Sequence, residues 1–360
     1  MQSTITAKRW FFPVFNAFIG LILGGLTGYY LRLLWPCIGL GLVFGLLVGT
    51  LVEWLTGLSG MHRFLYRRRP LLAAILEIIL IIFVVAPYAF AYLQLRPQPR
   101  TICCVTPLDY GAAAYEEVRI PTTDAITLAG WYVPPRETPG AVIIILHGSG
   151  GDRRGCEWYA RQFIAAGYGI LLYDQRALGE SGGATQSYGW LDGADLLDAA
   201  GWLAVRSDVD ASRIGAVGLS GGGNISLNAA HLDPDKIAAY WLDGVWAQRI
   251  PDFPQSKNIG EQFATLINGI ILKMAEIQVG RSAPPAFSEI LPQLKNVPIV
   301  LVAAELDDFE VRVNRQYAEI LPPNIESWII PDAYHVGGPL IIPQEYSQKM
   351  LGFFSASFEK

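Results

Sequence analysis

The stretch Arg213–Leu232, RIGAVGLSGGGNISLNAAHL, decides the fold. Its first part, Ile214 to Leu219, is a short apolar run typical of a buried strand, and a helix-compatible run follows the turn. Between them, Gly218-Leu219-Ser220-Gly221-Gly222 matches the G-x-S-x-G pattern in its strand–turn–helix setting, the nucleophile elbow. So sharp a turn strains the backbone at the serine, and side chains two residues away would clash with it. We therefore expect Ser220 Oγ to stand above the first amides of a helix, which can stabilise an oxyanion.

A second match to the same pattern is Gly179-Glu180-Ser181-Gly182-Gly183. The chain has 37 glycines, so a chance match is expected and the context of each motif decides. Residues 175–178 before this match are not a buried strand, and residues 184–187 after it have the composition of a loop. We therefore interpret Ser181 as a turn residue and Ser220 as the nucleophile.

The charge distribution divides the chain in two. Residues 1–100 hold nine Lys and Arg against two acids, a net +7, whereas the remaining 260 residues carry −12. The mean hydropathy of +0.31 is high for a purely soluble protein, and the apolar excess lies in the first part. The later part is acidic and has no basic stripe, which argues against a nucleic-acid partner.

Three apolar stretches fill the first part of the chain, at about 10–31, 35–55 and 71–93. Each reaches the ~20 residues that a helix needs to cross a bilayer. The first two carry glycines four residues apart, at Gly20, Gly24 and Gly28 and at Gly41, Gly45 and Gly49. Such rows allow close helix packing. We expect residues 1–95 to form about three transmembrane helices, so that the protein is a multi-pass membrane protein in contact with the lipid bilayer.

The basic residues near these stretches predict the topology. Lys8 and Arg9 share one side with four arginines of the second loop, whereas Arg32, Arg96 and Arg100 lie on the other side. The positive-inside rule then places the amino terminus in the cytoplasm and the rest of the chain, after a linker at 96–111, on the extracytoplasmic side.

From about residue 112 the pattern changes to strands that alternate with helices, which predicts an α/β domain with a mostly parallel sheet. We expect an opening hairpin, then a series of apolar strands, with helices between them at Glu157 to Ala166 and Asp192 to Val205. The expected strands are Glu116 to Pro121, Ile126 to Val133, Ala141 to Leu146, Gly169 to Tyr173, Ile214 to Leu219, Ile237 to Leu242, Pro298 to Ala303 and Ser327 to Ile330.

This part, residues 112–360, resembles the α/β-hydrolase family, in its esterase/dienelactone-hydrolase-like and serine-aminopeptidase-like branches. His147-Gly148-Ser149 resembles the family's oxyanion turn, and Asp174 to Ser181 its D-x-R-G-x-G-x-S loop, with Ala177 where Gly is usual. The resemblance implies a mostly parallel sheet with helices on both faces, a small helical cap, and a nucleophile, acid and histidine in that chain order.

The histidine follows by elimination among four. His62 lies in the membrane-proximal part, His147 precedes the nucleophile in a glycine turn, and His231 ends the helix behind Ser220. His335 follows the last expected strand, a position that resembles the family's catalytic histidine. We therefore expect His335 to be the general base.

The acid should follow the preceding strand. Asp307 matches the family's G-x-x-D position, with Ala304 in place of Gly, and is the preferred candidate. Its neighbours Glu305 and Asp308 stay open, and so does Asp243, which follows another expected strand where this fold can also place its acid.

The expected chemistry is that of a serine hydrolase with a Ser220–His335–Asp307 triad. It would cleave an ester, thioester or amide through an acyl-enzyme, with the amides of Gly221 and Ser149 as the oxyanion hole. Neither a metal nor an organic cofactor is expected, because no His/Cys cluster has ligand spacing and the glycine turns lack a P-loop lysine. The alternatives are a peptidase acting on short peptides and a catalytically silent scaffold or binding domain.

An insert at about 248–292 precedes the acid strand. Apolar residues recur in it at three- and four-residue steps from Ile259 to Ile277, which predicts an amphipathic helix. We interpret this helix as an apolar lid over the acyl pocket, with a helix packed on the core as the alternative. A lid beside a membrane would favour a hydrophobic acyl substrate.

Overall fold

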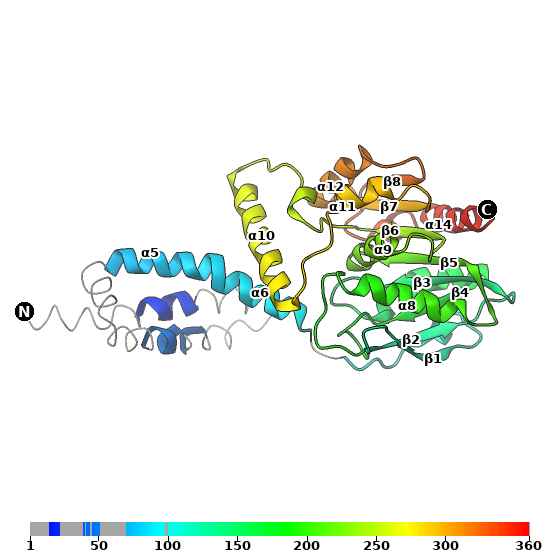
Figure 1. Ribbon diagram of the computed structural model, residues 1–360, viewed down its shortest axis with the longest axis horizontal. Helices are drawn as coiled ribbons and strands as arrows, with labels where there is room; N and C mark the ends of the chain where they lie inside the picture. The colour runs from blue at the N-terminus through cyan, green and yellow to red at the C-terminus, as the bar shows by residue number, and fades with distance from the viewer. Residues whose placement is uncertain are drawn as a thin grey trace, which may run out of the picture. The chain divides into compact units, whose positions relative to one another are not determined.

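The computed structural model describes residues 14–21, 39, 41–43, 45–50, 70–97 and 100–359. The chain divides into two compact units, Met1–Val85 and Ala86–Lys360 (Figure 1). In the first unit, residues 14–21, 41–43 and 45–50 are helical, followed by α5 (Pro70–Leu80) and a π-helical turn, Ile81–Val85.

Glycines bring helical segments of the first unit into close contact. A Cβ added to Gly20 would lie 2.0 Å from the carbonyl oxygen of Gly41, and one added to Gly45 would lie 2.1 Å from that of Asn16. Neither position has room for any other residue. The expected close packing of the first two apolar stretches is thus seen where the structure describes them.

Within the described residues, one helix is long and apolar enough to cross a membrane, Ile78–Leu95. Only 17% of this window is buried. It overlaps the third expected span, 71–93. Much of the expected spans 10–31 and 35–55 lies outside the described residues, and the three-helix segment stays a prediction.

The second compact unit begins earlier in the chain than the expected α/β domain. The sequence places the end of the membrane segment at residue 95, but α6 (Ala86–Leu95) belongs to the second unit. The reason is that α6 buries Pro87, Ala91 and Leu95, and Ala91 and Leu95 share an apolar cluster with Ala275 of helix α10 (Ile259–Val279). The carbonyl of Leu95 also accepts a hydrogen bond of 2.9 Å from the amide of Gln186.

An eight-stranded sheet forms the centre of the second unit, in the order β1-β2-β4-β3-β5-β6-β7-β8. β1 and β2 form the expected hairpin, β2 pairs antiparallel with β4, and the pairs from β4 to β8 are parallel. The strands are β1 (Glu116–Pro121), β2 (Thr127–Val133), β3 (Gly140–Leu146), β4 (Gly169–Tyr173), β5 (Val209–Leu219), β6 (Ala239–Asp243), β7 (Ile299–Ala304) and β8 (Ile325–Ile330).

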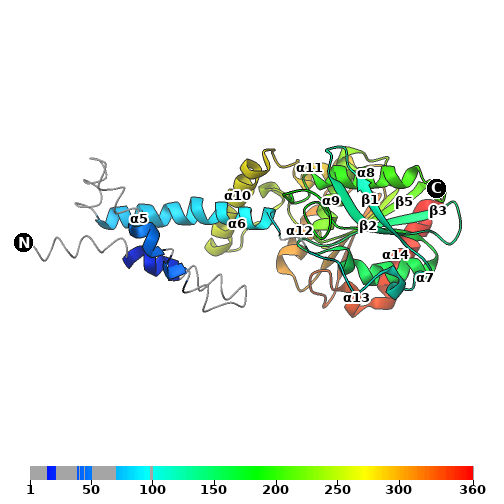
Figure 2. The same ribbon diagram turned by 90° about the horizontal axis from the view of Figure 1, so that it is seen from below.

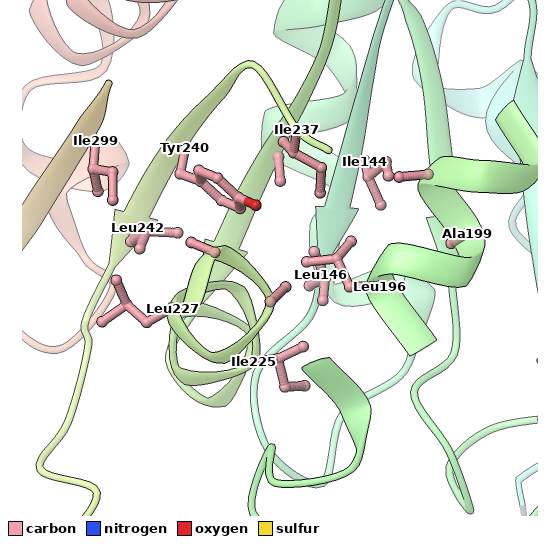
Figure 3. Packing of buried hydrophobic residues seen from close by; sticks show 14 of the residues in the cluster. Ile144, Leu146, Leu196, Ala199, Ile225, Leu227, Ile237, Tyr240, Leu242 and Ile299 are labelled. Atoms are coloured by element: carbon pink, nitrogen blue, oxygen red, sulfur yellow. The ribbon is translucent and has the colours of Figure 1, made fainter. Parts of the chain in front are cut away.

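Helices cover both faces of this sheet, as the expected three-layer architecture requires (Figure 2). Strand β3 shows the reason, because its side chains alternate: Ile144 and Leu146 enter one core and Ile143 and Ile145 the other. Figure 3 shows the first of these cores, where side chains of β3, β6 and β7 meet those of α8 and α9. The helices are α7 (Glu157–Ala166), α8 (Asp192–Ala204), α9 (Gly221–Leu232), α10, α11 (Phe287–Ile290), α12 (Asp308–Ala318), α13 (Gly338–Ile341) and α14 (Pro343–Phe358).

The strands and helices expected after residue 112 are all present, with ends that differ by up to about five residues. Helix α12, between β7 and β8, is one that the sequence did not predict. It begins directly after Asp307, and this determines where the site's carboxylate lies.

Candidate active site

The turn between β5 and α9 has the strained geometry of a nucleophile elbow. Ser220 adopts φ 53° and ψ −116°, a conformation that costs free energy for a residue with a Cβ. A Cβ at Gly218 would lie 2.4 Å from the carbonyl oxygen of Gly222, and one at Gly222 would lie 2.6 Å from that of Leu146. The glycines of the motif are therefore required by close backbone approach, as the sequence predicts.

The side chain of Ser220 meets His335, as expected, but the carboxylate behind the histidine is not Asp307. The Nε2 atom of His335 lies 2.9 Å from Ser220 Oγ, and its Nδ1 lies 2.5 Å from Glu310 Oε2. The Glu310 side chain is fully buried. Ser220, Glu310 and His335 follow one another in the chain in the order that the resemblance implies for nucleophile, acid and histidine.

Asp307 has a different task, which corrects the sequence-based assignment. It is the N-cap of α12, and its Oδ1 accepts a hydrogen bond of 3.0 Å from the amide of Glu310. The side chain that caps a helix turns back toward the helix amides, whereas Glu310, one turn later, points to the sheet. There its second oxygen accepts from the amide of Ala304 at 2.7 Å.

The other two candidates next to Asp307 do not bond His335. Asp308 pairs with Lys257 at the surface, and Glu305 accepts a long hydrogen bond from the amide of Asp332. The sequence does carry a signal for Glu310: Asp307-x-x-Glu310 is the spacing of a helix-capping box, which predicts a helix start here. A helix beginning at that point makes Glu310, three residues after its N-cap, a candidate.

Glu310 sets the protonation of the histidine. Burial disfavours the imidazolium, but the hydrogen bond and the charge of Glu310, helped by Asp243 and Asp307, outweigh it and raise the pKa of His335 above its ordinary value. A carboxylate on Nδ1 also fixes the tautomer that leaves Nε2 free to accept the proton of Ser220 Oγ.

Asp243, the remaining alternative acid, lies buried at the end of β6. Its Oδ2 accepts hydrogen bonds from the hydroxyls of Tyr159, at 2.8 Å, and Tyr346, at 2.6 Å. Burial raises the pKa of Asp243 and the two tyrosine hydrogen bonds lower it. Burial has the larger effect, so the pKa is about 6. Its backbone carbonyl accepts from the amide of Ser220 at 2.7 Å. Asp243 therefore supports the elbow from beneath rather than contacting the imidazole by a hydrogen bond.

The two predicted oxyanion donors lie against each other. A Cβ at Gly221 would be 2.2 Å from Ser149 Oγ and 3.3 Å from the amide nitrogen of Ser149, so the two turns are in close contact. A Cβ at Gly148 would be 3.4 Å from the Cβ of Ser220. The amide of Gly221 begins α9, where the helix dipole favours negative charge.

His147 and Ser181, from the two remaining motifs, bond the backbone. His147 is buried, with Nδ1 2.8 Å from the carbonyl of Gly148 and Nε2 3.1 Å from the amide of Gln175, and burial lowers its pKa. Ser181 bonds the carbonyl of Asp174 and accepts from the amide of Ala129 at 2.8 Å. Both residues are tied to the backbone, which agrees with the structural roles that the sequence assigns to them.

An aromatic group lines the approach to the imidazole. The ring centroid of Trp246 lies 6.1 Å from that of His335 and 5.0 Å from that of Phe309, which in turn contacts Phe253. Trp246 is partly exposed. Such a surface suits an apolar substrate portion next to the reacting atoms.

Helix α10 contacts α6 and, at its amino end, α12. Ala275 is its buried residue, and it packs on α6. Its amino end is joined to α12 by ion pairs: Lys257 Nζ lies 2.8 Å from Asp308, and Arg312 lies 3.2 Å from Glu261. These contacts make α10 a connection between α12 and α6, and the lid interpretation stays a prediction.

One group of described residues has the composition and spacing to hold a metal ion, Asp307, Glu310 and His335, whose ligand atoms lie within 4.8 Å of one another. In this arrangement Nδ1 of His335 already bonds Glu310, and its Nε2 bonds Ser220. The same atoms thus form a proton relay to a serine, which is the chemistry that the elbow geometry favours.

Comparison with known proteins agrees with this fold. Residues 141–283 match the family model described as alpha/beta hydrolase fold. An esterase of Pyrococcus furiosus superposes with a TM-score of 0.57 at 23% identity, covering 73% of this chain and 98% of that one. The alpha/beta hydrolase GrgF from Penicillium gives a TM-score of 0.54 at 18% identity, covering 69% and 100%. The chain therefore has the α/β-hydrolase fold.

Curated relatives match over shorter regions. A thiohydrolase of Eupenicillium brefeldianum is 26% identical over 62% of this chain and 70% of its own length. A polyketide transferase of Gibberella fujikuroi is 31% identical over 32% of this chain. An uncharacterised protein of Bacillus subtilis is 38% identical over 21%. The chain spans only 37% and 25% of the length of the latter two relatives.

Proposed function

We propose that the protein is a serine hydrolase that cleaves a carboxylic ester or thioester through a Ser220–His335–Glu310 triad. The observation that carries the proposal is the continuous series of short contacts from the strained serine to a buried carboxylate, 2.9 Å and then 2.5 Å. The similarity to a thiohydrolase and to solved esterase and hydrolase structures supports this reaction class.

In the proposed reaction, His335 Nε2 removes the proton of Ser220 Oγ as this oxygen attacks the substrate carbonyl. The amides of Gly221 and Ser149 stabilise the oxyanion, and Glu310 stabilises the imidazolium. His335 then protonates the leaving alcohol or thiol, and a water, deprotonated by the same imidazole, hydrolyses the acyl-enzyme.

The first test is labelling with a fluorophosphonate, which reacts with an activated serine. We expect the wild type and Ser181→Ala to be labelled, and Ser220→Ala and His335→Ala to lose the label. Ser181→Ala is the matched control, because it removes the serine of the other G-x-S-x-G sequence. A well-folded wild type that takes up no label would refute the hydrolase and favour a silent binding domain.

We also propose that the Ile78–Leu95 helix attaches the catalytic unit to a membrane, on the extracytoplasmic side. The support is the apolar composition of this helix and the excess of basic residues in the loops that the topology places inside. Cys103 and Cys104 are exposed just after this helix. A membrane-impermeant maleimide should label them in intact cells, with Cys103→Ser/Cys104→Ser as the control. Labelling only after permeabilisation would reverse the orientation.

A further inference from the structure

Helix α10 carries apolar side chains on two opposite faces. One face holds Ile271, Ala275 and Val279, which recur at four-residue steps. They belong to the apolar cluster that also contains Ala91 and Leu95 of α6. Figures 1 and 2 both show α10 beside α6. This face is therefore accounted for by packing within the catalytic unit.

The other face is exposed. Ile259, Leu266 and Ile277 are 82%, 53% and 63% exposed. At about 100° per residue they fall within roughly 40° of one another, opposite the face that meets α6. A helix that is apolar on opposite faces is normally surrounded by protein core or by lipid. The outer face of α10 thus has the composition of a surface that meets an apolar phase.

The neighbour of α10 indicates which phase this is. α6 is the second half of the apolar Ile78–Leu95 helix, and Tyr88, Tyr92 and Leu93 on it are exposed. The guanidinium of Arg96 stacks 4.1 Å above the Tyr92 ring and donates to Gln278 of α10 at 2.9 Å. Tyrosine and arginine at the end of an apolar helix are typical of the membrane–water interface. Gln278 of α10 bonds Arg96 at this end of α6. The exposed apolar face of α10 therefore lies next to the end of the apolar helix, where the interface would be.

The opposite end of α10 adjoins the catalytic machinery. Lys257, just before α10, pairs with Asp308, and Glu261, in its first turn, pairs with Arg312. Asp308 and Arg312 both belong to α12, the helix whose first turn carries Glu310. α10 therefore runs from the membrane-proximal helix α6 to the helix that holds the catalytic carboxylate.

We propose that α10 lies at the boundary between headgroups and acyl chains of a phospholipid bilayer, with Ile259, Leu266 and Ile277 among the chains. In this position it delivers to Ser220 an ester or thioester whose acyl chain is dissolved in the bilayer. The substrate class rests on the proposed hydrolase, and the lipid contact rests on the proposed membrane attachment of the Ile78–Leu95 helix. Lys273, exposed near the outer face and paired with Glu276, is long enough to place its ammonium at the headgroup level.

The lipid contact is tested on the full chain reconstituted in phosphatidylcholine–phosphatidylglycerol vesicles, with its native cysteines replaced by alanine. An environment-sensitive NBD fluorophore is placed at Leu266→Cys or, as a control, at Val205→Cys. Val205 is 84% exposed and follows α8 at the amino edge of the sheet. Doxyl-labelled lipids should quench the fluorophore at 266 and not at 205. Iodide in the aqueous phase quenching both positions equally would overturn the proposal.

The delivery role is tested in the same vesicles with two esters. We expect Ile259→Gln/Leu266→Gln to lower hydrolysis of vesicle-dissolved p-nitrophenyl palmitate by about tenfold and to leave water-soluble p-nitrophenyl acetate within about twofold, because only the palmitate needs the apolar surface. The matched control Val205→Gln/Leu232→Gln removes two exposed apolar side chains elsewhere and should change neither rate.

An equal effect on both esters, or none on the palmitate, would overturn the delivery role. A wild type that hydrolyses neither ester and takes up no fluorophosphonate would refute the hydrolase instead. The fluorescence result at position 266 would stand in that case, so the two failures are distinguishable.

Discussion

The turns after β5 and after β7 both end a parallel strand and begin a helix at the same edge of the sheet, yet they present their functional side chains differently. In the first, Ser220 is itself the turn residue, with φ 53°. In the second, the turn residue Asp307 caps the helix, and the carboxylate that bonds His335 is that of Glu310, one helical turn later. The glycines that a strained turn requires identify Ser220 directly in the sequence. A carboxylate at the start of a helix can instead cap that helix, so its position in the sequence does not show which role it has.

The sharpest test of this comparison exchanges the two carboxylates for amides. We expect Glu310→Gln to lower kcat by up to about 10⁴-fold, the cost typical of removing the triad acid. Asp307→Asn keeps a good N-cap and should change kcat little. Both are measured by ester hydrolysis. An equal loss in the two variants would return Asp307 to the triad.

The pH profile of the same variant gives an independent readout. Glu310 raises the pKa of His335, and catalysis needs the neutral imidazole, so wild-type kcat/KM should rise with pH to a half-maximum above the ordinary histidine value. In Glu310→Gln the acidic limb should move to lower pH. A limb that stays in place would mean that another group titrates.

A substitution at Gly221 changes the geometry of the elbow without changing any titratable side chain. In Gly221→Ala the new Cβ would meet Ser149 Oγ at 2.2 Å and push the two oxyanion turns apart. We expect kcat to fall by about 10²–10³-fold, as for loss of one oxyanion donor, with a smaller change in KM. Gly352→Ala, on α14, where the new Cβ would have no heavy atom within 4 Å, serves as the control for expression and handling. Unchanged kcat would exclude these amides from the oxyanion hole.

Beneath the elbow, Asp243 should make stability depend on pH. Its folded-state pKa of about 6 lies above the ordinary value of 3.8, so the folded state holds its proton longer than the unfolded state. Stability should therefore fall as the pH rises from about 4 to about 6, by up to ~3 kcal/mol. Asp243→Asn should flatten this part of the curve of Tm against pH. An identical slope in the variant would contradict the raised pKa.

The smallest effect concerns the cap. Asp307→Ala removes the acceptor for the amide of Glu310 and should cost about 1 kcal/mol, lowering Tm by roughly 2–4 °C. Asp307→Asn should retain the wild-type Tm. If the alanine variant melts normally but loses activity, Asp307 acts on the chemistry and not on the helix.

Features that depend on residues close together in the chain could be predicted from the sequence, whereas contacts between distant segments could not. The strands of the sheet and the two turns that follow β3 and β5 could be predicted, because continuous apolar runs and glycines report local constraints. His335 could be found because the sequence around each of the other three histidines places it away from the carboxyl ends of the strands or in a glycine turn. Helix α12 is harder to predict, because Phe309, Val311 and Val313 alternate with charged residues, a period-two pattern typical of a strand.

The sequence by itself determined the α/β fold with its mostly parallel sheet, through its apolar runs, and its motifs resembled those of α/β-hydrolases. It also singled out Ser220, from the glycines around it, and His335, by elimination. Only the tertiary structure decided that Glu310 accepts from the imidazole and that α10 packs on α6. Both facts depend on the direction in which a helix projects its side chains toward a neighbour distant in the chain. That direction is set by packing, which no single stretch of sequence contains.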